Sequence, residues 1–231
     1  MSQDVEVQSA TLPVAEIIYP DSDGKPMADN TRQYQDIITI QVGLDSLFAA
    51  RPDVFVAADL CWYPVEGQPG IRQAPDVLVA FGRPKGHRGS YKQWEEGAVA
   101  PQVVMEILLP SNRRREMTAK RLFYERYGVQ EYYAYDPDRG RLEVWQRQGD
   151  RLLQVTPSSP WTSPLLGIRL TLKADGALRV QRPDGRVFLR PMDIEAEAEQ
   201  ERQRAEQAEQ RTQRLAARLR ALGVDPETLT E

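Results

Sequence analysis

Three short apolar runs, rich in β-branched residues, constrain the fold of this chain more than any other feature. They cover residues 54–65, 74–81 and 102–110, and turn-rich or polar segments separate them. Runs of this length between turn signals are typical of strands rather than helices. The run at 74–81 is apolar on both faces, which indicates a strand in the interior of a sheet. We therefore predict a sheet with buried central strands.

Helical patterns lie on both sides of these three strands. Apolar residues recur at helical intervals over 31–49, before the first run. After the third run, a second helix is predicted over 118–127, and Gly128 ends it. A fourth strand at 131–137 then turns into a hairpin strand at 141–147. The order helix, three strands, helix, strand predicts an α/β fold of the α+β kind with a mixed sheet.

The rest of the chain divides into an extension, a helix and two ends. Short strand-like runs with Gly and Pro turns continue to about residue 192, which predicts a small antiparallel extension. From 193 to 222 the chain consists mostly of Glu, Gln, Arg and Ala and contains no Gly or Pro, and a long helix is expected. We therefore divide the chain into an N-terminal arm (1–30), a globular domain (31–192), a C-terminal helix (193–222) and a tail (223–231).

The C-terminal helix carries a heptad pattern. Steps of four and three residues give a seam whose last third is rich in leucine: Ile194, Ala198, Glu201, Ala205, Ala208, Thr212, Leu215, Leu219 and Leu222. Such a seam is typical of a coiled coil, and a homodimer through this helix is one interpretation. A solvated single helix docked by its leucine-rich end is the other.

Composition excludes several classes of site. His87 is the only histidine and Cys61 the only cysteine, which excludes multi-histidine zinc sites and intrachain disulfides. A cytoplasmic protein is expected, because no stretch approaches 18 apolar residues and no export signal pattern is seen. The net charge is −4, and residues 193–231, with ten acidic and six basic residues, account for all of it. The neutral domain before them is compatible with binding a polyanion.

Two carboxylates interrupt the apolar runs. Asp76 lies in the second run and Glu106 in the third, where strands normally carry apolar groups. An ionised carboxylate in such a setting is costly unless it is paired, hydrogen-bonded or bound to metal. If the two strands are neighbours, both side chains could converge on one Mg²⁺ ion. Alternatively, Asp76 caps a turn and Glu106 forms a structural ion pair with an arginine.

Basic residues follow both of these strands. We expect the two clusters to lie at the same edge of the sheet and to contact phosphate oxygens of a nucleic acid. A solvated loop is the alternative interpretation. The residues of the two clusters are Arg83, Lys85 and Arg88 after the second run, and Arg113, Arg114 and Arg115 after the third.

The chain resembles a large bacterial family of restriction endonuclease-like proteins, named after Uma proteins, within the PD-(D/E)xK nuclease superfamily. The resemblance rests on APDVLVAF, VVMEILLPSN, the lysine of MTAKRLFYERYGV, and QEYYAYDPD, in that order. It implies an α-β-β-β-α-β core of the restriction-endonuclease type. It also implies Asp76 and Glu106 as metal ligands, Mg²⁺ or Mn²⁺ as the cofactor, DNA as the partner, and a lysine that assists the attack of water.

The chain departs from the family pattern at several positions. The superfamily has lysine two residues after the second acid, where Leu108 stands, and Lys120 in the next helix is the matching lysine. Leu109 replaces the usual serine. An acid near the first helix is also common in the family, and Asp59 on the first strand is another candidate for that role. The remaining acids near that helix, Asp23, Asp29 and Asp36, are poor substitutes on sequence grounds.

Three functions are compatible with these features. The first is a Mg²⁺-dependent DNA endonuclease with Asp76, Glu106 and Lys120 as catalytic residues. The second is a catalytically inactive nucleic-acid-binding or assembly protein that keeps the nuclease fold, which Leu108 and Leu109 favour. The third is a structural scaffold that presents a coiled-coil tail. Aromatic residues of the first and fourth strands are expected to fill the core rather than to form a binding platform.

Overall fold

The structure of the protein, a computed structural model, describes residues 17–24, 26–157 and 160–222. Most of the N-terminal arm and the whole tail at 223–231 therefore lie outside the described residues. One six-stranded sheet organises the domain, in the order β1-β3-β5-β6-β7-β8. Its strands are β1 Val54–Ala58, β3 Val77–Phe81, β5 Val103–Ile107, β6 Glu131–Asp136, β7 Arg141–Gln148 and β8 Arg151–Val155.

The sheet is mixed, as the sequence predicts. Strands β5 and β6 are parallel, and every other neighbouring pair in this sheet is antiparallel. A parallel pair needs a crossover connection, and helix α2 (Arg114–Arg126) supplies it. With α1 (Thr31–Leu47) before β1, the two helices and the first four strands of this sheet follow the predicted α-β-β-β-α-β order.

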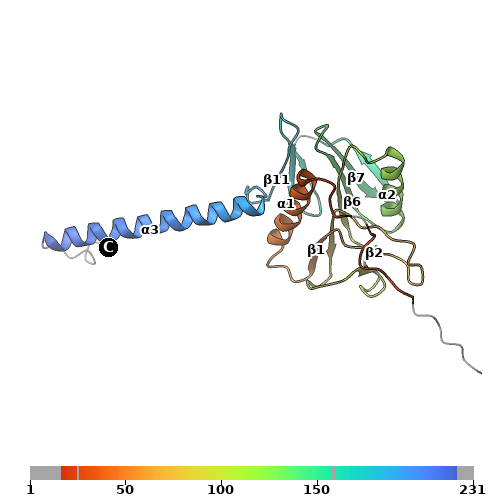
Figure 1. Ribbon diagram of the computed structural model, residues 1–231, viewed down its shortest axis with the longest axis horizontal. Helices are drawn as coiled ribbons and strands as arrows, with labels where there is room; N and C mark the ends of the chain where they lie inside the picture. The colour runs from red at the N-terminus through yellow and green to blue at the C-terminus, as the bar shows by residue number, and fades with distance from the viewer. Residues whose placement is uncertain (1–16, 25, 158–159, 223–231) are drawn as a thin grey trace, which may run out of the picture.

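Helices cover both faces of the main sheet (Figure 1). On one face, Ile37, Ile40 and Leu44 of α1 pack into a core formed by the sheet and by the C-terminal extension. On the other face, Tyr124 of α2 joins a second, aromatic-rich core that includes Trp62. The aromatic residues of the first and fourth predicted strands are buried, which confirms that they fill the core.

Two smaller sheets complete the domain. The extension forms an antiparallel sheet of β9 (Trp161–Thr162), β10 (Arg169–Leu172) and β11 (Leu178–Gln181). The other pairs β2 (Trp62–Tyr63) with β4 (Tyr91–Lys92) in parallel.

The structure corrects three predicted boundaries. The first apolar run is not one strand, because the backbone breaks after β1 at Asp59, which has a φ of +48°. The polar segment after β3 contains β4, which the sequence pattern did not predict. Helix α2 begins at Arg114 rather than at Thr118, so the second and third arginines of the basic cluster lie within the helix.

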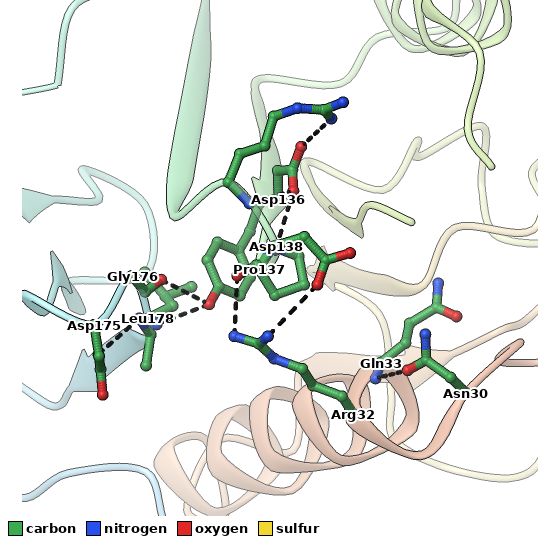
Figure 2. Close-up of polar contacts among 12 residues, drawn as sticks. Asn30, Arg32, Gln33, Asp136, Pro137, Asp138, Asp175, Gly176 and Leu178 are labelled. Atoms are coloured by element: carbon green, nitrogen blue, oxygen red, sulfur yellow. Dashed lines mark hydrogen bonds and ion pairs between the residues drawn. The ribbon is translucent and has the colours of Figure 1, made fainter. Parts of the chain in front are cut away.

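The start of α1 is attached to the end of β6 (Figure 2). Asn30 caps the helix by accepting a hydrogen bond from the Gln33 backbone N–H at 2.9 Å. Arg32 then donates to the Pro137 carbonyl at 3.0 Å and lies 3.5 Å from the Asp138 carboxylate. These contacts hold the first turn of α1 against the same end of the sheet at which β5 ends.

The C-terminal helix α3 (Pro191–Ala221) projects away from the domain (Figure 1). None of its residues is buried, and Leu215 and Leu222 are 54% and 74% exposed. No helix among the described residues is long and apolar enough to cross a membrane.

Candidate active site

The strand register brings Asp76 and Glu106 together. Strands β3 and β5 are antiparallel, and Val77 pairs with Met105. The next position along this ladder aligns Asp76, just before β3, with Glu106, near the end of β5. Both carboxylates line one cavity of about 340 Å³. The sequence-based expectation that the two acids lie on neighbouring strands agrees with this arrangement.

Helix α2 holds the Glu106 carboxylate through two side chains. Lys120 donates to Glu106 Oε2 at 2.7 Å, and the Tyr124 hydroxyl donates to Oε1 at 2.5 Å. Lys120 and Tyr124 are four residues apart, so they lie on the same face of the helix. Glu106 is only 3% exposed, so its charge needs a partner. That partner is Lys120, and not the arginine that the structural alternative required.

Burial and neighbouring charges shift the pKa values of these groups. Burial raises the pKa of Asp76 well above its usual value, and the nearby charge of Glu106 raises it further. Burial alone would lower the pKa of Lys120, but the charge and hydrogen bond of Glu106 outweigh it and raise the pKa. Burial and the same carboxylate raise the pKa of Tyr124, which therefore remains a neutral hydrogen-bond donor.

Asp76 is fixed by the backbone of the neighbouring strand. The Ile107 N–H donates to Asp76 Oδ2 at 2.6 Å. This contact joins the two strands and does not cap a turn within one segment, which was the structural alternative for Asp76.

Asp59 lines the same cavity from a third segment. Its backbone is in the left-handed region, with a φ of +48°, and its N–H donates to the Pro75 carbonyl at 3.1 Å. A non-glycine residue in this region costs energy and is found most often where surrounding structure enforces it. Burial and the charge of Asp23 raise the pKa of the Asp59 carboxyl.

Sequence reasoning missed several polar residues of this cavity. Asp23 and Asp29, set aside as poor substitutes for the acid near the first helix, line it together with Glu116 of α2. Asp36 does not. Gln33 also lines it, and its amide donates to the Ile107 carbonyl at 2.9 Å. The position of Gln33 in the first turn of an N-capped helix was the one signal in the sequence.

The oxygen ligands of this cavity suit a hard divalent cation. Mg²⁺ is commonly held by one or two carboxylates and keeps several waters, and Asp76 and Glu106 provide two carboxylates in one cavity. Within the described part of the chain, no group of three or more His, Cys, Asp or Glu side chains is arranged to hold a metal ion. The residues present therefore fit a cation with two protein carboxylates and water, and not a closed structural site.

The expectation that both basic clusters share one edge of the sheet is wrong. Asp76 precedes β3, so the segment after β3 begins at the opposite end of that strand. There, Lys85 pairs with Asp45, Arg88 pairs with Glu96, and Arg83 donates to the Glu96 carbonyl. None of these three basic side chains lines the cavity.

The second basic cluster lies beside the cavity. Ser111 and Asn112 line it, and Arg113, Arg114 and Arg115 follow directly at the start of α2. All three arginines are exposed.

A protein family and solved structures are similar to this chain. The Uma2 family, described as "Putative restriction endonuclease", matches residues 23–175. A solved structure titled as a putative nuclease belonging to DUF820 from Anabaena variabilis ATCC 29413 is similar at 17% identity, with a TM-score of 0.47, over 66% of this chain and 83% of the other. A search of curated proteins found no match. Because the family match covers well over half of the sequence and includes the cavity, this chain belongs to the Uma2 family of restriction endonuclease-like proteins.

Proposed function

We propose that this protein is a metal-dependent endonuclease that hydrolyses phosphodiester bonds of DNA, with Asp76, Glu106 and Lys120 as its catalytic residues. The family indicates a restriction-type nuclease. The observation that carries the proposal is the convergence of these three side chains on one cavity, with Lys120 bonded to Glu106. A structural ion pair would not need a second, desolvated carboxylate beside it, because like charges in a buried site oppose each other.

In this proposal, Asp76 and Glu106 hold a Mg²⁺ or Mn²⁺ ion. When bound, the ion supplies Lewis-acid polarisation of the phosphate and lowers the pKa of a water molecule. Tyr124 and the Ile107 N–H each fix one oxygen of a carboxylate and so orient both acids toward the cavity. Asp59 lines the same cavity, and in this proposal its carboxylate accepts a hydrogen bond from a water molecule.

Lys120 provides a fixed positive charge. Its ammonium is part of the cavity lining and is anchored by Glu106. A cation held there stabilises the negative charge that develops on a phosphate oxygen during attack. Position 108 directly follows β5 and is two residues from Glu106, so its side chain lies on the same face as Glu106 if the extended backbone continues. A lysine at position 108 would reach the Glu106 carboxylate from the end of β5, and Lys120 reaches the same carboxylate from α2. The absence of a lysine at position 108 is therefore no argument for the inactive alternative.

The arginines at the start of α2 are proposed to contact the DNA backbone. Arg113, Arg114 and Arg115 are exposed next to the cavity, and such residues bind phosphates without reading sequence. Arg83, Lys85 and Arg88 are not part of this surface, because they lie at the other end of β3 and are paired internally.

Cleavage of supercoiled plasmid tests the proposal. Wild-type protein is expected to nick or linearise the plasmid with Mg²⁺ or Mn²⁺ and not with a chelator. Asp76→Asn, Glu106→Gln and Lys120→Met should each abolish cleavage, while Asp150→Asn, in an exposed turn between β7 and β8, should not. Salt-sensitive binding without cleavage by the wild type would support the inactive alternative. Metal-dependent cleavage of RNA but not DNA would replace the proposed substrate.

We also propose that α3 pairs with α3 of a second copy in antiparallel orientation. Residues 193–209 carry seven acids and two arginines, a net of −5, whereas residues 210–222 carry four arginines and no acid, a net of +4. Antiparallel pairing sets these halves against each other and places Leu222 near Ile194 of the other copy. Parallel pairing would instead align the acidic halves.

The mass in solution tests this pairing. Light scattering after gel filtration should give a dimer for the full chain, and Leu215→Glu with Leu219→Glu should give a monomer. Ala217→Glu, which lies off the seam, serves as the control. A monomeric wild type at micromolar concentration would refute the pairing.

A further inference from the structure

A second and larger cavity lies on the α2 side of the main sheet. Its volume is about 600 Å³, and it lies between α2 and strands β6 and β7. Arg114 and Arg121 of α2 line one side, and Tyr132 of β6 and Trp145 of β7 lie on the sheet side. We call this space the α2 groove. Its volume is within the range of sites that hold a nucleotide-sized ligand.

Aromatic surface forms part of the sheet side of the α2 groove. Tyr132 and Trp145 are opposite each other in the β6–β7 ladder, and their rings stack at 4.8 Å between centroids and 24° between planes. Tyr132 is buried, whereas Trp145 is only partly buried and remains accessible from the groove. Aromatic side chains presented in this way stack on bases of any sequence.

The groove also carries a net positive charge. Four arginines line it, against the carboxylates of Asp136 and Glu143, which gives a net of +2. These two carboxylates pair with Arg139 and Arg141 on the sheet side.

The two arginines on the α2 side form fewer or longer contacts within the protein than the two on the sheet side. Arg114 is exposed, and its guanidinium has no hydrogen bond or ion pair with any described residue. Arg121 forms one long contact with a side chain, a hydrogen bond and ion pair from its Nη1 to Glu125 Oε2 at 3.5 Å. These two guanidinium groups are therefore the ones available for a phosphate.

One short segment separates the α2 groove from the candidate active site. After β5, Leu108 lines the groove, Leu109 lines the cavity of Asp76 and Glu106, and Asn112 lines both. A nucleic-acid strand with its phosphate at the active site can therefore cross Asn112 and enter the groove with the adjoining nucleotide.

We propose that the α2 groove binds an unpaired nucleotide of the substrate strand, with its base against Trp145 and its phosphate on Arg114 and Arg121. This inference rests on the proposed nuclease function. An intact duplex keeps its bases stacked inside the helix, so it can offer the groove only phosphates at the rim. A base that reaches the aromatic side must come from a single strand, a gap or a flipped nucleotide.

Binding by full-length protein tests the groove separately from cleavage. Fluorescence anisotropy in the presence of a chelator compares a labelled single-stranded 12-mer, a duplex with a three-nucleotide gap, and a blunt duplex. Wild type should bind the first two more tightly than the blunt duplex. Trp145→Ala should weaken their binding by about 5- to 150-fold and leave the blunt duplex unchanged, and Trp145→Phe should recover most of the loss.

An exposed variant keeps the test decisive if Trp145→Ala does not fold. Arg114→Ala should weaken single-strand binding and reduce the slope of log K against log salt by about 1. Arg126→Ala, exposed on α2 but outside the groove, should match wild type.

Two results would refute the proposal that the groove binds an unpaired nucleotide, and neither depends on cleavage. Equal binding of all three probes would do so, as would a loss in Trp145→Ala that is the same for blunt duplex and single strand. If the protein never cleaves but binds single strands in a Trp145-dependent manner, the proposed nuclease function is refuted and the groove proposal is supported. If cleavage needs Asp76 and Glu106 but substitutions of Trp145 and Arg114 do not change single-strand binding, the groove proposal is refuted and the nuclease proposal is supported.

Discussion

Replacing Tyr124 with phenylalanine isolates one hydrogen bond of the candidate active site. The Tyr124 side chain is fully buried, and its hydroxyl donates to Glu106 Oε1 at 2.5 Å. Phenylalanine keeps the ring, which packs against Trp62 and Tyr132, so the aromatic core should be preserved. The variant leaves Glu106 with Lys120 as its remaining side-chain partner among the described residues.

The expected loss follows from the charge and burial of the acceptor. A hydrogen bond to a charged group contributes about 1.5–3 kcal/mol, and Glu106 is nearly inaccessible to water that could replace the donor. For a protein of this size, about 2–4 °C in Tm corresponds to 1 kcal/mol. Tyr124→Phe should therefore lower Tm by about 3–12 °C.

Thermal unfolding in the presence of a chelator measures this loss, and Tyr132→Phe is the matched control. Tyr132 is equally buried and lies in the same aromatic core, but its hydroxyl makes no hydrogen bond with any described residue. The control should stay within about 0.5 kcal/mol of wild type. If the two variants unfold at the same temperature, the Tyr124 hydroxyl does not hold Glu106 and the argument for a positioned carboxylate fails.

Three further substitutions test the scaffold around the site by thermal or denaturant unfolding. Gly140→Ala should destabilise more than Gly149→Ala: both glycines have a φ near +58°, but a Cβ at 140 would lie 2.7 Å from the Gly176 Cα, whereas at 149 it meets nothing within 4 Å. Equal losses would show that backbone strain alone matters. Glu131→Ala should cost about 2–4 kcal/mol, because this buried carboxylate accepts hydrogen bonds from two hydroxyls and a backbone N–H; a loss under 1 kcal/mol would contradict this. Asp136→Asn should cost about 1 kcal/mol at pH 7. Burial would raise the pKa of Asp136, but an arginine and two turn amides lower it, so the stabilisation is full above the unfolded pKa of about 3.9 and disappears as the pH falls through the folded value. A wild-type advantage that persists below pH 2 would contradict this assignment.

The order of helices and strands along the chain was predictable because its signals are local. The runs that became β3, β5 and β6 are short, apolar and bounded by turns, and each of them is buried on both faces. The break after β1 was not predictable in the same way. It depends on Asp59 adopting a left-handed backbone between two apolar segments, and nothing in the apolar pattern marks that residue.

The pairing of Asp76 with Glu106 was predictable in part. The cost of a buried carboxylate identified both residues, but the register that aligns them is a property of the assembled sheet. Tyr124 was overlooked because a tyrosine in an apolar helix stripe is usually a core residue. Its spacing of four from Lys120 was the available signal that both could reach one acceptor.

The error over Arg83, Lys85 and Arg88 came from strand direction. If Asp76 at the start of one strand lies beside Glu106 at the end of the next, the strands must be antiparallel. The segment that follows β3 is then at the far end of the sheet by geometry alone. Of the two basic clusters, the one after β5 is therefore the one that lies at the cavity end of the sheet.

The position of the lysine links the two cavities on either side of residues 108–112. With the ammonium supplied by Lys120 from α2, position 108 need not be polar, and Leu108 is free to line the α2 groove beside Tyr132. A lysine at position 108 would instead extend its ammonium toward the Glu106 carboxylate, and its side chain would no longer line the α2 groove. The relocation of the lysine and the aromatic groove are therefore compatible features of one surface, and they give physical reason to examine both with the same single-stranded and gapped substrates.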